Sequence, residues 1–222
     1  MLSPAQRHVM RQQAVEASQQ ADGPLRHANG YERMLMKLNE DKRRLSKTRS
    51  REKKAELKRE MLPGYLPWVS GVLSQGKGAQ DAILMTVMIW RLDAGDIAGA
   101  LDIARYALQY GLVPPDKFRR NSTAYLLTEE VADAATRTWT AKEPVDIDPL
   151  LATLELTKSE DMPDEVRAKL HKITGYVLRD MGRALDAMEH LKRALQLHSR
   201  CGVIKDIERL ATDLKKQALA SR

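Results

Sequence analysis

A glycine-rich segment in the first half of the chain comes close to a phosphate-binding loop. Residues 71–78 read Gly-Val-Leu-Ser-Gln-Gly-Lys-Gly, which nearly fits the pattern G-x-x-x-x-G-K-[ST]. That pattern needs a hydroxyl after the lysine to hold magnesium, and it follows a buried strand. Here Gly78 takes the hydroxyl position, and Trp68–Leu73 has the pattern of a helix. These departures favour a joint between two helices, and no cofactor is expected.

Two Pro-Asp pairs resemble part of a metal-dependent nuclease motif. They lie in Pro115-Asp116-Lys117 and in Pro163-Asp164-Glu165. Metal-assisted hydrolysis requires clustered carboxylates, and the usual context of this motif is a pair of strands, which the sequence does not indicate. Both pairs also suit a turn or the start of a helix. A nuclease that uses Asp116, Asp164 and Glu165 stays an alternative, and we assign no catalytic residue.

Histidine and cysteine are not arranged as in known metal sites. His190 and His198 are eight residues apart, which is too far for a pair of ligands one helical turn apart, and no H-E-x-x-H sequence occurs. The single cysteine, Cys201, rules out an intramolecular disulfide and a cysteine-based metal site. We therefore expect no metal, and a protein of a reducing compartment.

The net charge of the protein lies in its first quarter. Residues 1–62 contain 15 Lys and Arg against 8 Asp and Glu, whereas the rest of the chain contains 22 of each. Most of the excess falls between residues 33 and 59, with 12 basic and 4 acidic residues. These twelve are the predicted DNA-binding residues: Arg33, Lys37, Lys42, Arg43, Arg44, Lys47, Arg49, Arg51, Lys53, Lys54, Lys58 and Arg59.

Such a segment favours a nucleic-acid backbone as its partner. A basic arm on a neutral body is suited to a polyanion, and Ser46, Thr48 and Ser50 add hydroxyl donors for phosphate oxygens. The segment lacks aromatic residues between its charges, which favours duplex DNA over single strands. We favour nucleic acid over the alternative of a solvated helix face or a disordered tail. A helical scaffold whose arm binds an acidic protein is a further alternative.

The elements that would carry these residues are helices. Hydrophobic residues make up 43% of the chain and aromatic residues 5%, and the common residues Ala, Leu, Met, Lys, Arg and Gln are helix formers. We predict an all-α protein. Ala82–Leu92 is about half the ~20 residues that a membrane-spanning helix needs, and residues 1–20 have no apolar core of a secretory signal. We therefore expect a soluble intracellular protein without a membrane partner.

Breaks and caps predict where the helices begin and end. Ser3-Pro4-Ala5-Gln6 reads as a helix start. A basic helix begins after Asn29-Gly30 and could run unbroken to Met61, because neither Gly nor Pro interrupts it. The body should start near Tyr65 and contain helices close to Trp68–Leu73, Ala79–Leu92, Ile97–Tyr110, Ser122–Trp139, Pro149–Lys158, Pro163–Arg179, Arg183–His198 and Val203–Leu219.

This pattern predicts three parts: a basic helical DNA-binding arm (1–62), a central helical core (63–143) and a C-terminal helical domain for contacts with other protein chains (144–222). Ala100-Leu101-Asp102 and Ala184-Leu185-Asp186 echo each other within similar helices. The echo is consistent with antiparallel helix pairs of the tetratricopeptide kind, although shared helix-forming composition explains it equally well.

Several stretches carry a resemblance to a known family. They are Leu2–His8, Gln75–Gly78, Leu84–Asp96, Ala100–Gly111 and Glu129–Ala132. Together they resemble the small terminase subunit of cohesive-end tailed bacteriophages with contractile tails, often labelled the terminase endonuclease subunit. The resemblance covers most of residues 1–140 and identifies no active site.

The resemblance implies a role in viral DNA packaging and virion assembly in the host cytoplasm. Small terminases recognise the packaging site on double-stranded phage DNA, form rings or other homo-oligomers, and bring in the large terminase subunit with its motor and nuclease. The expected function is therefore DNA recognition and recruitment without catalysis by the isolated chain. The endonuclease label keeps a metal-dependent cut at the cohesive-end site as an alternative.

Overall fold

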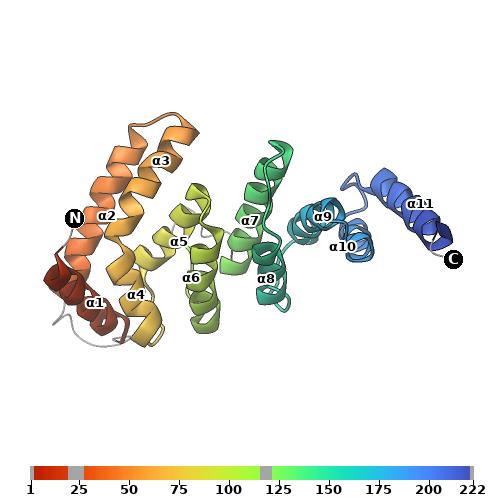
Figure 1. Ribbon diagram of the computed structural model, residues 1–222. Coiled ribbons are helices and arrows are strands. Elements are labelled where there is room, and N and C mark those ends of the chain that lie inside the picture. Colours follow the sequence, from red (N-terminus) through yellow and green to blue (C-terminus); the bar gives the residue numbers. More distant parts are fainter. Residues whose placement is uncertain (1–2, 20–27, 116–121, 221–222) are drawn as a thin grey trace. The chain divides into compact units, whose positions relative to one another are not determined.

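The computed structural model describes residues 3–19, 28–115 and 122–220, and within them the protein is entirely helical (Figure 1). No strand occurs in these ranges, so the predicted all-α class is confirmed. The α-helices are α1 Pro4–Gln19, α2 Ala28–Ser46, α3 Arg51–Met61, α4 Leu66–Gln75, α5 Ala82–Ala94, α6 Ile97–Tyr110, α7 Thr123–Thr140, α8 Asp148–Leu156, α9 Asp164–Asp180, α10 Ala184–Leu197 and α11 Ile204–Ala220, with a 3-10 helix η1 at Leu62–Gly64.

The chain forms two compact units, Met1–Thr123 and Ala124–Arg222. Unit 1 contains α1 to α6, and unit 2 contains most of α7 and all of α8 to α11. The segment predicted as the arm therefore shares unit 1 with most of the predicted core. The division into three functional domains stays a prediction.

The first helix begins as the sequence predicts. The Ser3 backbone N–H donates to Gln6 Oε1 at 2.8 Å, and the Gln6 N–H donates to Ser3 Oγ at 3.2 Å, which is a capping box. Helix α1 packs on α4, where Gly71 is buried. A Cβ at Gly71 would lie 2.4 Å from the Arg11 carbonyl oxygen. This glycine therefore serves a close contact between helices, and the segment 71–78 is a helix followed by a joint.

Helix α5 is the core of unit 1. Every residue from Ile83 to Trp90 is buried, as expected for a helix that is apolar on nearly all sides. Its N-cap is Asp81, whose Oδ1 accepts from the backbone N–H groups of Ile83 and Leu84 at 2.7 and 2.9 Å. Among the described residues, no helix is both long and apolar enough to span a bilayer.

The prediction of one continuous basic helix is wrong, because the segment forms two helices. Helix α2 ends at Ser46 and α3 begins at Arg51. Ser46 Oγ donates to the Arg43 carbonyl at 2.8 Å, and Ser50 Oγ accepts from the Lys53 N–H at 3.3 Å as the N-cap of α3. Serine side chains that bond to nearby backbone compete with helical hydrogen bonds, so a break forms without Gly or Pro.

Polar contacts hold α2 and α3 against the rest of unit 1. The Tyr65 hydroxyl donates to Asp41 Oδ2 at 2.7 Å. Burial, together with this hydrogen bond and the charge of Asp41, raises the pKa of Tyr65 above its usual value. Arg59 Nε donates to the Ala94 carbonyl at 3.0 Å. The apolar residues of α2 that face inward are also buried: Met34, Leu38 and Leu45.

Unit 2 is built around α9 and α10, which pack closely on each other. Gly175 of α9 allows this approach, because a Cβ there would lie 2.8 Å from the side chain of Leu191. Trp139 of α7 stacks on Tyr176 of α9 with ring centres 4.9 Å apart, and its indole N–H donates to Asp180 at 2.7 Å. These contacts tie α7 to the helical pair.

Two histidines meet inside the α9–α10 pair. His171 Nδ1 and His190 Nδ1 are 3.0 Å apart, so one neutral ring donates and the other accepts. Burial, the charge of His190 and the nearby Arg193 and Arg167 lower the pKa of His171 to about 4. Burial likewise lowers the pKa of His190, although Glu189 and Asp186 oppose the shift and Arg183 adds to it.

This pair predicts an acid-sensitive stability. In the unfolded chain His171 titrates near pH 6.5, so between about pH 6.5 and 4 the unfolded state binds more protons. The free energy of unfolding should therefore fall as pH falls through this window and stay flat above it. Urea unfolding from pH 7.5 to 4.5 measures the free energy of unfolding of the wild type and of His171→Gln. Both proteins contain the same carboxylates, so the difference between their free energies at each pH leaves the contribution of His171. An identical pH slope in the two proteins would contradict the prediction.

Candidate nucleic-acid interface

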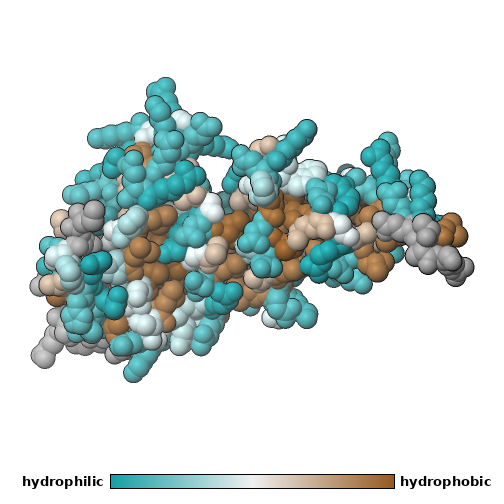
Figure 2. Space-filling model, in the orientation of Figure 1, coloured by the Kyte–Doolittle hydropathy of each residue, from teal (hydrophilic) through white to brown (hydrophobic). Residues whose placement is uncertain are grey.

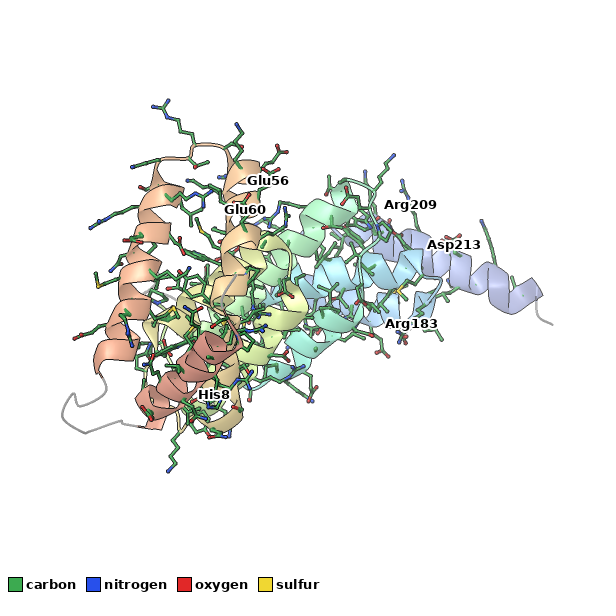
Figure 3. The ribbon with its side chains drawn as sticks, turned by 60° about the vertical axis from the view of Figure 1, so that its left-hand side comes forward. His8, Glu56, Glu60, Arg183, Arg209 and Asp213 are labelled. Carbon is green, nitrogen blue, oxygen red and sulfur yellow. The ribbon has the colours of Figure 1, made fainter. Side chains whose placement is uncertain are left out.

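The turn between α2 and α3 presents a cluster of basic side chains to solvent. We call this cluster the basic tip. Its members are all exposed: Arg43, Arg44, Lys47, Arg49, Arg51 and Lys53. Within residues 43–53 the only acidic residue is Glu52. Figure 2 shows hydrophilic side chains gathered where α2 turns into α3, and the α2–α3 end carries long side chains that project from the ribbon in Figure 3.

The backbone of the tip is fixed by local hydrogen bonds. The Thr48 N–H donates to the Leu45 carbonyl at 3.1 Å, and the Lys54 N–H donates to the Ser50 carbonyl at 3.1 Å. The hydroxyl of Ser50 acts as an acceptor in its cap, so its proton is still available to a phosphate oxygen. The proton of Ser46 is already donated to Arg43. The turn is thus a small, ordered platform for the basic side chains.

In the described part of the chain, Arg44 of the tip forms an ion pair. Arg44 lies 3.3 Å from Glu60 of α3, and the two side chains are 58% and 62% exposed; Figure 3 labels Glu60. Exposed pairs of this kind contribute at most about 1 kcal/mol. Arg44 can therefore exchange Glu60 for a phosphate at little cost, and the tip keeps its positive charge.

The other predicted DNA-binding residues lie elsewhere on unit 1. Lys37 pairs with Asp41 at 2.6 Å and lies 3.9 Å from the centre of the Tyr65 ring. Lys58 pairs with Asp93, and Arg59 bonds to Ala94. The remaining three are Arg33, exposed near the start of α2, and Lys42 and Lys54, which line a groove.

The acidic residues of the two Pro-Asp pairs are the predicted candidates for a metal centre. Among the described residues, no three His, Cys, Asp or Glu side chains lie close enough to hold a metal ion. Asp164 and Glu165 form the first turn of α9, where acidic residues stabilise the helix dipole. Asp116 and Lys117 lie outside the described residues. The second Pro-Asp pair is therefore a helix start.

Comparison with known proteins decides the family. The sequence profile described as "Phage small terminase subunit" matches residues 35–165, which is more than half of the chain. The chain belongs to the phage small terminase subunit family. This small terminase subunit is also 61% identical over 215 residues to the "Terminase, endonuclease subunit" of Escherichia phage P2, with 97% of this chain and 87% of the relative covered. No solved structure matches.

The family resemblance predicted from sequence is therefore confirmed, and the subunit takes part in packaging phage DNA. The profile spans the second part of α2, all of the basic tip, and the helices from α3 to the start of α9. Most of unit 1, together with the first helices of unit 2, thus carries the sequence features by which the family is known.

Proposed function

We propose that this small terminase subunit binds duplex DNA at the phage packaging site through the basic tip and recruits the large terminase subunit. One observation carries the first half of the proposal. Six exposed basic side chains surround a single ordered turn, with one acidic residue among them. In a DNA-packaging subunit, the chemistry that suits such a surface is contact with phosphates.

The tip suits a duplex backbone better than unpaired bases. Single-strand sites use aromatic side chains as stacking platforms, and residues 43–53 contain none. Phosphate contacts carry little sequence information, so selection of the packaging site would come from base-edge contacts or from the ease with which the site bends. Binding through the tip should therefore be strong at low salt and steeply salt-dependent.

The helical body provides the surfaces for protein partners in this proposal. Helices within Met85–Tyr110 and Leu170–Leu197 would contact the large subunit and further copies of the chain, with a ring as the assembled form. Antiparallel pairs such as α5–α6 and α9–α10 support a tetratricopeptide-like arrangement. The assembly would act in the host cytoplasm, and the large subunit would supply the motor and the nuclease.

A second candidate function is DNA cleavage by the subunit itself. The observation that favours it is the printed name of the phage P2 relative, "Terminase, endonuclease subunit". Magnesium-dependent hydrolysis needs a cluster of carboxylates, and no three His, Cys, Asp or Glu side chains of the described residues lie close enough together to hold a metal ion. Of the residues that would carry it, Asp164 and Glu165 form the first turn of α9, and Asp116 lies outside the described ranges.

One experiment separates the two. Fluorescence anisotropy of a labelled packaging-site duplex with the full chain, at ~0.05 to 0.3 M salt, should give a log–log slope of about −5 if all six tip residues meet phosphates. The same mixtures with magnesium, examined on a denaturing gel, should show an intact duplex. Absence of binding at ~0.1 M salt would overturn the proposal, and magnesium-dependent cuts at the site would favour the endonuclease.

A further inference from the structure

A groove of about 760 Å³ lies in unit 1 beside the basic tip. Its walls are the last turns of α2, the face of α3 that carries Lys54 and Lys58, the first part of α5, and the segment Val113–Pro115 after α6. We call it the basic-rimmed groove. Its volume falls in the range of about 300 to 1,000 Å³ that is typical of ligand pockets.

The floor of the groove is mostly apolar and well packed. Ala82, Thr86 and Trp90 line it from one face of α5 at spacings of four residues. Trp90 is 4% exposed and packs edge-on against the buried Tyr65, with ring centres 5.8 Å apart. A floor held in this way is present before any ligand arrives, so binding would not require the floor to become ordered.

The outer wall is also fixed in place. The Gln80 side chain donates from Nε2 to the Val113 carbonyl at 2.9 Å, and its Oε1 accepts from the Val113 N–H at 2.9 Å. This pair of bonds fastens the 113–115 segment to the start of α5. The Val113 side chain is nevertheless 58% exposed. The wall therefore offers an apolar side chain on a backbone that is held still.

The rim is positively charged. Three of the residues that line the groove are lysines, Lys42, Lys54 and Lys58, and none of the described lining residues is acidic. Lys58 also pairs with Asp93, which lies outside the lining. An apolar floor with a basic rim is complementary to a chain that is apolar at its centre and acidic at its edges.

We propose that the basic-rimmed groove binds an acidic segment of the large terminase subunit that carries a bulky apolar anchor. This inference rests on the proposed function, in which the large subunit is the protein partner. DNA fits the groove less well, because a duplex has a convex, charged backbone with nothing to place on the apolar floor. Single-strand binding would need an open ring face, and Trp90 is almost fully buried.

The test places charge in the outer wall, at two residues that are not among the twelve predicted DNA contacts, although three of those twelve, Lys42, Lys54 and Lys58, line the same groove. Val113→Glu/Pro115→Glu should weaken binding of the purified large subunit by on the order of tenfold or more, because like charges oppose each other in a desolvated contact. Val113→Lys/Pro115→Lys is the matched control, with long side chains of opposite charge, and should bind at least as tightly as the wild type. Calorimetry with the full chains measures both, after circular dichroism has verified the helix content.

The outcomes distinguish this inference from the function on which it rests. Equal losses of affinity in the Glu and Lys variants, or wild-type affinity in both, would show that the groove is not the binding site for an acidic segment. Either result would still allow this chain to recruit the large subunit through another surface. Absence of any complex between the wild-type chains would overturn recruitment as well. DNA affinity, measured in parallel, should stay within about threefold of wild type in both variants, because Val113 and Pro115 lie outside the basic tip.

A cross-link identifies the occupant directly. Val113→p-benzoylphenylalanine, irradiated with the large subunit and packaging-site duplex present, should join to a segment of the large subunit that is rich in Asp and Glu. The same amino acid at Arg43 in the basic tip should join to DNA instead. A cross-link from position 113 to DNA, to a second copy of this chain or to a basic segment of the large subunit would overturn the proposal.

Discussion

Changing Arg43, Lys47, Arg49 and Lys53 together to Gln is expected to weaken packaging-site DNA binding by about two to three orders of magnitude at ~0.1 M salt. Each phosphate contact contributes close to one unit to the slope of log K against log salt, so the slope should also flatten by about 3 to 4. All four side chains are exposed, and the cap of α3 uses the Lys53 backbone rather than its side chain. The helices should therefore remain folded.

A control with the same change in net charge shows whether position matters. Lys192, Arg200, Lys205 and Lys215 are exposed basic residues of unit 2, and their replacement by Gln removes the same number of charges. This variant should bind DNA within about threefold of wild type, since contacts with phosphate, rather than distant charge, dominate at this salt. Equal losses in the two variants would show that net charge alone attracts DNA and that the tip is not its site.

The sequence predicted the helices well because their limits are set locally. Ser3 and Gln6 form the cap they predict, and Gly95 and Gly111 end α5 and α6 in the left-handed conformation that favours glycine. The break between α2 and α3 was missed because only Gly and Pro were taken as interruptions. Three hydroxyl residues within residues 46–50, with Ser50 as a cap, carried the signal.

The division of the basic run into a tip and a groove could not be predicted. Lys53 and Lys54 are neighbours of the same type, yet one projects from the tip and the other lines the groove. Which way each points depends on how α3 packs on α5, a contact between residues distant in sequence. The pairing of His171 with His190 across two helices was missed for the same reason, because only spacings within one helix were considered.

Asp81 should have the largest effect on stability of any single carboxylate in unit 1. It is 4% exposed, and its two oxygens accept three hydrogen bonds: two from the start of α5 and one from Trp68 Nε1 at 2.8 Å. Asp81→Ala removes the cap, worth about 1 to 2 kcal/mol, and leaves the buried indole N–H unsatisfied, at about 1 to 3 kcal/mol. We expect the free energy of unfolding to fall by about 2 to 5 kcal/mol.

Urea unfolding followed by circular dichroism and tryptophan fluorescence measures this loss. Ser50→Ala is the matched control, because Ser50 is the N-cap of α3 and its Oγ accepts from the Lys53 N–H at 3.3 Å, yet the residue is exposed. Water can replace the lost acceptor there, so the cost should be about 1 kcal/mol. Similar losses in the two variants would show that burial adds nothing to the cap of α5.

Asp81→Asn tests why this position needs a carboxylate. The two oxygens of Asp81 face donors on both sides, the α5 backbone and Trp68, whereas an amide has one oxygen and must turn its NH₂ toward one of these donors. In the background of Trp68→Phe the indole donor is absent, so the asparagine can direct its oxygen at the helix and the NH₂ meets no opposing N–H. The cost of Asp81→Asn should therefore be at least about 1 kcal/mol smaller in Trp68→Phe than in the wild type. Additive losses would mean that Asp81 serves α5 alone and that its bond to Trp68 contributes no stability.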